Sequence, residues 1–123
     1  MKILVVDDER DIQTLFQQKF RKEIGDHEME FAFAFSGEEA LEFMQANEHE
    51  AVLILSDINM PGMDGLALLC AIKQQRPDLP VMMVTAYGDD ERRRKAAEFG
   101  AAEFVTKPVD FNLLKQQLQQ LSA

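Results

Sequence analysis

Short apolar runs alternate along the chain with longer stretches in which apolar residues recur every three or four positions. Apolar runs of about four to eight residues are typical of buried strands, and the longer spacing is typical of amphipathic helices. The predicted strands are residues 2–6, 29–35, 51–56, 80–85 and 102–106. In the second of these, Phe31, Phe33 and Phe35 share one face, which we expect to pack in the core.

Each predicted strand is followed by a predicted helix. The helices are expected at residues 9–23, at 37–46, from Asp64, from about Asp89 to Phe99, and from Asp110. Their spacing predicts core-facing positions at Ile12, Leu15, Phe16, Phe20, Leu66, Leu69, Cys70, Ile72, Phe111, Leu114, Leu118 and Leu121. Ser36 and Glu39 form a capping-box pattern at the start of the second helix, and Gly100 is typical of the end of the fourth.

Five strands in strict alternation with five helices predict an α/β fold with a parallel sheet covered on both faces. Right-handed crossovers between the strands leave few topologies open. No stretch of the sequence has the composition of a linker, so we expect one domain over residues 1–123. In such a sheet, ligands bind at the carboxyl ends of the strands, which makes those positions the ones to inspect.

Charge is unevenly distributed over this acidic chain. Its 22 Asp and Glu residues against 13 Lys and Arg give a net charge of −9, which disfavours direct nucleic-acid binding. Residues 24–72 contain no Lys or Arg, whereas residues 92–95 read Arg-Arg-Arg-Lys. Two interpretations remain open here, namely solvated faces of opposite sign or a polarised surface that steers partners.

Nothing in the sequence predicts export or membrane insertion. No apolar run approaches the ~20 residues that a membrane helix needs, and the N-terminus lacks the features of a signal peptide. The single cysteine, Cys70, excludes an internal disulfide and is interpreted as a small core residue. We therefore expect a cytoplasmic protein. His27 and His49 lie beside acids in predicted loops and are interpreted as surface residues.

Polar side chains follow four of the predicted strands. Asp7 and Asp8 follow the first, Asp57 the third, Thr85 ends the fourth, and Lys107 follows the fifth. Three neighbouring carboxylates raise one another's pKa unless a cation lies among them, and oxygen ligands of this kind suit Mg²⁺. Asp8 also fits a simple helix cap, but that interpretation does not explain the other positions.

The acidic loops argue against a nucleotide or flavin site, because phosphate cradles are rich in glycine or hydroxyl groups. With Mg²⁺ present, one of these carboxylates becomes a candidate nucleophile towards a phosphoryl group. Lys107 would then neutralise the phosphoryl oxygens, and Thr85 would donate a hydrogen bond to one of them.

The segments VVDDE, LSDINMPGMDG, VTAYG and FVTKP stand in this order at the predicted strand ends. Together they resemble the receiver domain of two-component response regulators, over essentially the whole chain from Lys2 to about Leu121. The resemblance implies a doubly wound five-stranded parallel sheet of order 2-1-3-4-5, the flavodoxin-like or CheY-like (βα)5 fold. It also implies a cis peptide bond between Lys107 and Pro108.

The resemblance further assigns roles to the residues at the strand ends. Asp57 matches the phospho-acceptor, which takes its phosphoryl group from a histidine kinase or another phosphohistidine protein. Asp7 and Asp8 match the acid pair that, with Asp57, positions Mg²⁺, and Asn59 matches the residue whose backbone carbonyl completes the metal site. No other cofactor is implied.

Three further positions match residues that bind the phosphoryl group or respond to it. Thr85 and Lys107 match the residues that bind its oxygens. Thr85 also belongs to the family's switch, together with an aromatic residue that is often Tyr and is Phe104 here. The implied output surface comprises the helix at 89–99, the strand at 102–106 and the helix from Asp110, which would bind an output protein or form a homodimer.

The implied function is that of a signalling switch that catalyses only its own phosphotransfer and dephosphorylation, and two alternatives stay open beside it. One is an aspartyl-phosphate hydrolase of the haloacid dehalogenase type, although Asp57-Ile58-Asn59-Met60-Pro61 departs from that class's D-x-D-x-T. The other is an interaction module that works without phosphorylation. We expect a single receiver domain, 1–123, without an output domain in this chain, either acting alone or as part of a longer regulator.

Overall fold

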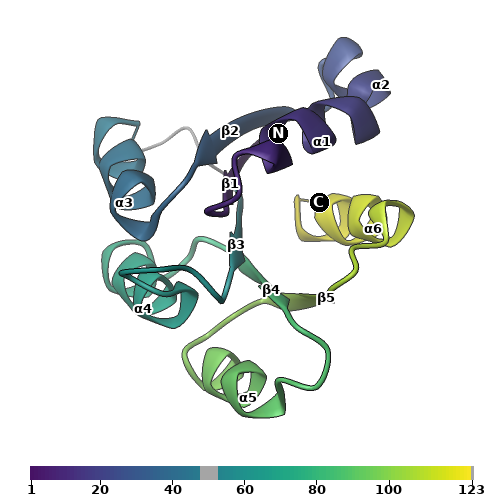
Figure 1. Cartoon of the computed structure of the whole chain (residues 1–123). Helices are drawn as coiled ribbons and strands as arrows, with labels where there is room; N and C mark the ends of the chain where they lie inside the picture. The colour runs from purple at the N-terminus through teal and green to yellow at the C-terminus, as the bar shows by residue number, and fades with distance from the viewer. Residues whose placement is uncertain (48–52, 123) are drawn as a thin grey trace.

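The computed structural model describes residues 1–47 and 53–122. Its centre is one sheet of five parallel strands in the order β2-β1-β3-β4-β5 (Figure 1). The strands are β1 (Lys2–Val6), β2 (Glu30–Ala34), β3 (Leu53–Asp57), β4 (Val81–Thr85) and β5 (Glu103–Thr106). This confirms the predicted fold class and strand order. His49 and the first two residues of the predicted strand 51–56 lie outside the described residues.

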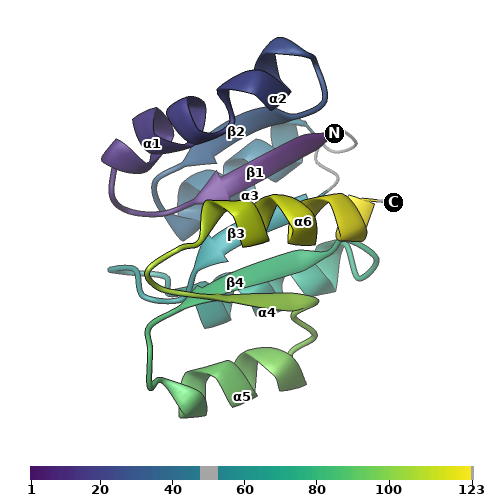
Figure 2. The same cartoon turned by 90° about the vertical axis from the view of Figure 1, so that its right-hand side faces the viewer.

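The described part of the chain contains six helices, which cover both faces of the sheet. They are α1 (Asp11–Lys19), α2 (Arg21–Gly25), α3 (Gly37–Ala46), α4 (Gly65–Gln75), α5 (Asp90–Glu98) and α6 (Phe111–Ser122). Helices α1, α2 and α6 lie on one face, and α3, α4 and α5 lie on the other (Figures 1 and 2). None of these helices is both long enough and apolar enough to cross a membrane.

The single helix predicted at 9–23 is wrong in one respect, because the chain breaks it at Phe20. The backbone of Phe20 leaves helical values, with φ −108° and ψ 21°, although hydrogen bonds continue from Phe20 N–H to Phe16 O and from Ile24 N–H to Phe20 O. The fully buried ring of Phe20 packs there against Phe16, Phe31 and Phe111. This tertiary cluster lies outside what a helical period can show.

The predicted helix boundaries at polar residues are confirmed. The Ser36 hydroxyl accepts a hydrogen bond from the Glu39 N–H at 3.1 Å, as an N-cap does. Asp64 and Asp89 cap α4 and α5 in the same way. Gly100 follows α5 with φ +99°, a conformation that glycine adopts without strain.

Six of the predicted core positions are buried, and the others are half-buried or lie at the rim of the core. Leu69, Ile72, Leu114 and Leu118 are fully covered on the two faces of the sheet, together with Phe16 and Phe20. Leu15 is 36% exposed and therefore lies at the rim of the core, and Cys70 is only half-buried. Phe35 lies beyond the end of β2, where the Arg10 guanidinium packs 4.5 Å from its ring centre.

Candidate functional site

Three carboxylates meet where β1 and β3 end side by side. The register pairs Val6 with Ser56, so Asp7 and Asp8 come after β1 just where Asp57 ends β3. One oxygen from each carboxylate lies within 4.8 Å of the others. Asp57 is 3% exposed, whereas Asp8 is open to solvent. The topology therefore gathers the three acids that the sequence places at separate strand ends.

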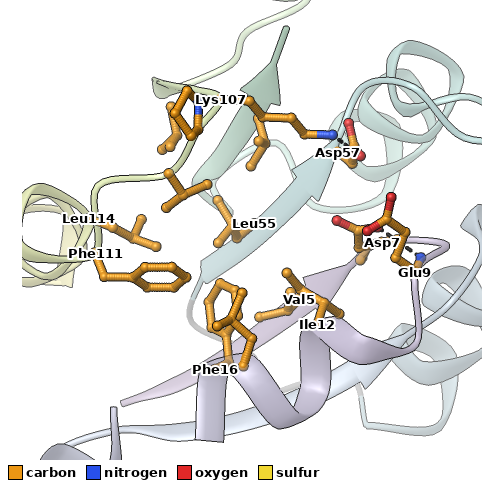
Figure 3. A pocket seen from close by; sticks show the side chains of 16 residues that line it. Val5, Asp7, Glu9, Ile12, Phe16, Leu55, Asp57, Lys107, Phe111 and Leu114 are labelled. Atoms are coloured by element: carbon orange, nitrogen blue, oxygen red, sulfur yellow. Dashed lines mark hydrogen bonds and ion pairs between the residues drawn. The ribbon is translucent and has the colours of Figure 1, made fainter. Parts of the chain in front are cut away.

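The buried Asp57 carboxylate is held by one partner on each oxygen. Its Oδ1 accepts a hydrogen bond from the Asn59 N–H at 3.1 Å. Its Oδ2 accepts one from Lys107 Nζ at 2.8 Å, which Figure 3 shows. A carboxylate that is removed from water needs such partners to stay ionised. Asp57 is thus fixed at the end of β3 with a cation beside it.

Lys107 reaches Asp57 from the far side of β4. Its backbone N–H donates to Thr85 O at 2.9 Å, and the Lys107–Pro108 peptide bond is cis, the isomer that the resemblance implies. Partial burial would lower the pKa of Lys107, but the hydrogen bond and charge of Asp57, with Asp7 and Glu9, outweigh it and raise the pKa. The ammonium therefore stays charged next to the carboxylates.

Within the acid cluster, the pKa of Asp7 is raised. Desolvation by burial is the main cause that raises its pKa from 3.8 to about 6, and the charges of Asp57 and Asp8 add to it. The hydrogen bond from the Glu9 N–H and the charge of Lys107 oppose the rise. Because the folded protein then holds this proton more tightly than the unfolded chain, the contribution of Asp7 to the stability of the metal-free protein should fall as pH rises from 3.8 to about 6.

This donor set fits a hard divalent cation. It consists of carboxylate oxygens alone, within 4.8 Å of one another, and includes one group whose ionised form is disfavoured without a counter-charge. Oxygens around an octahedral Mg²⁺ lie roughly 3 to 4 Å apart, since each metal–oxygen bond is about 2.1 Å. The three acids can therefore serve as Mg²⁺ ligands, directly or through water.

Thr85 and Phe104 lie on neighbouring strands near Asp57. Thr85 ends β4, is 2% exposed, and lines a hollow of about 350 Å³ with Ala86, Arg93 and Thr106. Phe104 lies on β5 and is half-buried, with the Arg93 guanidinium 4.9 Å from its ring centre. The predicted switch residues thus lie on adjacent strands, and a side chain from α5 covers the aromatic one.

An apolar cavity of about 410 Å³ flanks the acid cluster on the other face of the sheet (Figure 3). The side chains of Val5 and Leu55 on the strands, of Phe16 on α1 and of Leu114 on α6 line it. Asp7, Asp57 and Lys107 line the same cavity and lie together to one side of its apolar side chains. These charged groups are therefore next to apolar surface, which accounts for the desolvation of Asp7.

Sequence reasoning missed the residues that hold the loop of residues 58–64 between β3 and α4, which we call the acceptor loop after the predicted role of Asp57. Arg92 of α5 donates from Nη1 to the Asn59 side-chain oxygen, and its Nη2 lies 3.7 Å from Asp64 Oδ2. Gly65 follows the loop so closely that a Cβ there would lie 2.3 Å from the Asp57 carbonyl oxygen. The basic run at residues 92–95 is evident from the sequence, but the sequence does not show which of its side chains points towards the acceptor loop.

Two further residues, His27 and Tyr87, lie at the surface. His27 is exposed, with φ 59°, and Tyr87 is 91% exposed near the end of β4. Neither has an ion pair or ring contact within residues 1–47 and 53–122. The interpretation of His27 as a surface residue is therefore confirmed.

The family model and the sequence relatives agree on one family. Residues 3–119 match the family described as the response regulator receiver domain. Response regulator protein FleR of Pseudomonas aeruginosa is 37% identical over 113 residues, which are 92% of this chain and 23% of that protein. Transcriptional regulatory protein ZraR of Escherichia coli is 38% identical over 121 residues, 98% of this chain and 26% of that protein.

Solved structures agree with the sequence relatives. The receiver domain of NtrX from Brucella abortus has a TM-score of 0.83 and 36% identity, covering 98% of this chain and 97% of that one. A response regulator receiver domain protein from Clostridium thermocellum has a TM-score of 0.88 and 28% identity, covering 98% and 93%. The chain spans about a quarter of the length of FleR and ZraR. A family match over residues 3–119, relatives at 37% and 38% identity and a shared fold together show that this chain belongs to the response regulator receiver domain family.

Proposed function

We propose that this receiver domain accepts a phosphoryl group on Asp57 from a phosphohistidine, carried by a histidine kinase or a phosphotransfer protein in the cytoplasm. The observation that carries the proposal is the buried Asp57 carboxylate, which lies 2.8 Å from the Lys107 ammonium and beside two further acids. This environment suits a nucleophile towards phosphorus, and the turn contact between Oδ1 and the Asn59 N–H fixes the carboxylate in place.

The transfer conserves atoms and charge in a single displacement. A carboxylate oxygen of Asp57 forms a bond to phosphorus, the phosphorus–nitrogen bond breaks, and the histidine nitrogen keeps the electron pair. Lys107 neutralises part of the negative charge on the phosphoryl oxygens, and the Thr85 hydroxyl donates to one of them. Mg²⁺, held by Asp7, Asp8, Asp57 and the backbone carbonyl of Asn59, would supply further charge neutralisation.

The response would pass from Thr85 to the α5–β5–α6 surface. A phosphoryl group adds about −1.5 to −2 charges and strong acceptor oxygens, which attract the Thr85 hydroxyl. Phe104 would then turn towards the hollow beside Thr85 and repack α5 and α6 around β5. Since Phe104 has no hydroxyl, its inward position would rest on packing alone. An output protein or a second copy would bind the altered surface.

Phosphorylation by acetyl phosphate with Mg²⁺, followed by mass measurement of the intact protein, separates this proposal from the alternatives. A stable added phosphoryl group on Asp57 supports the switch, continuous release of phosphate supports a hydrolase, and no reaction supports a phosphorylation-independent module. Asp57→Asn should abolish the mass increase, and Asp26→Asn, which changes an exposed acid of the α2 C-terminus, should not.

The coupling to the surface has its own test. A beryllofluoride mimic of the phosphoryl group should shift backbone NMR signals across residues 85–115 more than those of α3 at residues 37–46. Equal shifts in both regions, or shifts confined to the acceptor loop, would contradict the proposed route through Thr85 and Phe104.

A further inference from the structure

Arg92 connects α5 to the acceptor loop. Its backbone lies in the first turn of α5, where its N–H donates to the Asp89 side chain at 3.4 Å. Its guanidinium leaves the helix and contacts two residues of the loop, the Asn59 side-chain oxygen through Nη1 and Asp64 Oδ2 at 3.7 Å through Nη2. One planar group therefore holds residues from both ends of the loop.

Each of the two loop residues is itself bound to a part of the site. The Asn59 N–H donates to Asp57 Oδ1 at 3.1 Å, and Asp64 Oδ1 caps α4 by accepting from the Ala67 N–H at 2.9 Å. The loop is closed further by the Gly65 N–H, which donates to the Ile58 carbonyl at 2.8 Å. Arg92 is thus connected to the Asp57 carboxylate through Asn59 and to the start of α4 through Asp64.

The neighbouring cations of the same basic run have other contacts. Arg93 packs on the Phe104 ring, and Lys95 pairs with Glu91 one turn back on its own helix. Arg94 is exposed, and no ion pair or ring contact is found for it within the part of the chain that the structure describes. Among these four residues, the acceptor loop is contacted by Arg92, so the run is not one uniform docking patch.

We propose that Arg92 is a positioning residue for the phospho-acceptor site and a direct link between that site and α5; this rests on the proposed function of Asp57. The guanidinium orients Asn59, which in turn orients the Asp57 carboxylate and presents a backbone carbonyl to Mg²⁺. A lysine cannot replace it fully, because one ammonium lacks the planar fork that contacts two acceptors at once. The link is separate from the route through Thr85 and Phe104.

Coupling of this kind acts in both directions. If the binding of Mg²⁺ at the acceptor site changes the position of α5, then displacement of α5 changes the equilibrium affinity for Mg²⁺ by the same free energy of coupling. The contact is partly exposed, with side-chain exposures of 37% for Arg92 and 36% for Asp64, so its effect is modest. We expect changes of about 3- to 10-fold, the size that the net contribution of one ordinary hydrogen bond gives.

The test uses the full chain with Arg92→Ala, Arg92→Lys and the matched control Arg94→Ala. NMR titration with Mg²⁺ alone gives the midpoint of metal binding, and acetyl phosphate at saturating Mg²⁺ gives the maximal phosphorylation rate. Arg92→Ala should raise the midpoint and lower the maximal rate by about 3- to 10-fold each, Arg92→Lys should fall between, and Arg94→Ala should match the wild type. Equal behaviour of the Arg92 and Arg94 variants would overturn the proposal.

Two further measurements separate this role from a loss of fold and from failure of the proposed function. In metal-free protein, Arg92→Ala should shift the amide signals of Asn59 and Ala67, whether or not Asp57 accepts a phosphoryl group. In the Asn59→Ala background, Arg92→Ala should have a smaller effect on the Mg²⁺ midpoint, because the shared contact is already gone. Fully additive effects of the two substitutions would contradict positioning through Asn59.

Discussion

Helices α4 and α5 pack on the same face of the sheet, but different forces hold them. Helix α4 has one charged residue among eleven and buries Gly65, Leu68, Leu69 and Ile72. Helix α5 has seven charged residues among nine and buries Ala96. Within the described residues, the side chains of Arg92 and Arg93 attach it further, Arg92 through the acceptor loop and Arg93 through the Phe104 ring.

This difference indicates which of the two helices is displaced at the lower cost in free energy. Displacing α4 would expose several leucine and isoleucine side chains, each of which contributes roughly 1.5–3 kcal/mol through burial. Displacing α5 would expose one buried alanine of its own, with the part of the core that this alanine covers, and would exchange partly exposed polar contacts for water, which costs less. Elements with few buried apolar contacts open at low free energy, and switching segments are drawn from them. Helix α5 therefore has the attachment expected of a mobile part of the proposed output surface.

The largest expected effect contrasts the two helices directly. Leu69→Ala removes a fully buried side chain from α4 and should lower the free energy of unfolding by about 2–5 kcal/mol. Ala96→Gly in α5 should lower it by about 1 kcal/mol, mainly through helix propensity. Urea unfolding measures both. If the two losses were equal, α5 would be held as firmly as α4 and the comparison would fail.

A second substitution tests how closely the start of α4 must pack against the end of β3. In Gly65→Ala, the added Cβ would lie 2.3 Å from the Asp57 carbonyl oxygen and 2.6 Å from the Ile58 Cα, both backbone atoms. The resulting shift should destabilise the fold by about 1–3 kcal/mol and slow phosphorylation of Asp57. Gly25→Ala is the control, since no atom lies within 4 Å of its Cβ, and it should leave the fold as stable or slightly more stable.

Native-state hydrogen exchange can compare the helices without substitution. Amides of residues 68–72 in α4 should exchange only through nearly global unfolding, because their side chains form part of the core. Amides of residues 93–97 in α5 should open at a free energy about 1–2 kcal/mol lower. Protection factors measured under conditions of fast intrinsic exchange give both values, and equal protection would contradict the looser attachment of α5.

The smallest effect concerns Arg93. Its guanidinium packs 4.9 Å from the centre of the Phe104 ring, so Arg93→Ala should lower the free energy of unfolding by about 0.5–1 kcal/mol. The same change should alter the ring signals of Phe104 and favour its inward position. Arg94→Ala serves as the control with the same loss of charge. Identical Phe104 spectra for the two variants would show that Arg93 does not hold the ring.

The sequence by itself determined the five strands, the strand-end acids and the helix caps at Ser36 and Asp64, because these depend on local periodicity and on side chains that bond within a few residues. It also placed Asp57, Thr85 and Lys107 at the ends of three different strands. Since the carboxyl ends of parallel strands share one edge, their convergence followed from the fold class.

Only the tertiary structure decided how the site is held. Arg92 and Asn59 are 33 residues apart, and no periodic pattern specifies which member of a basic run turns towards the acceptor loop. The break at Phe20 and the raised pKa of Asp7 likewise arise from packing between segments distant in sequence. Side-chain direction and desolvation depend on neighbours that only the folded chain brings together.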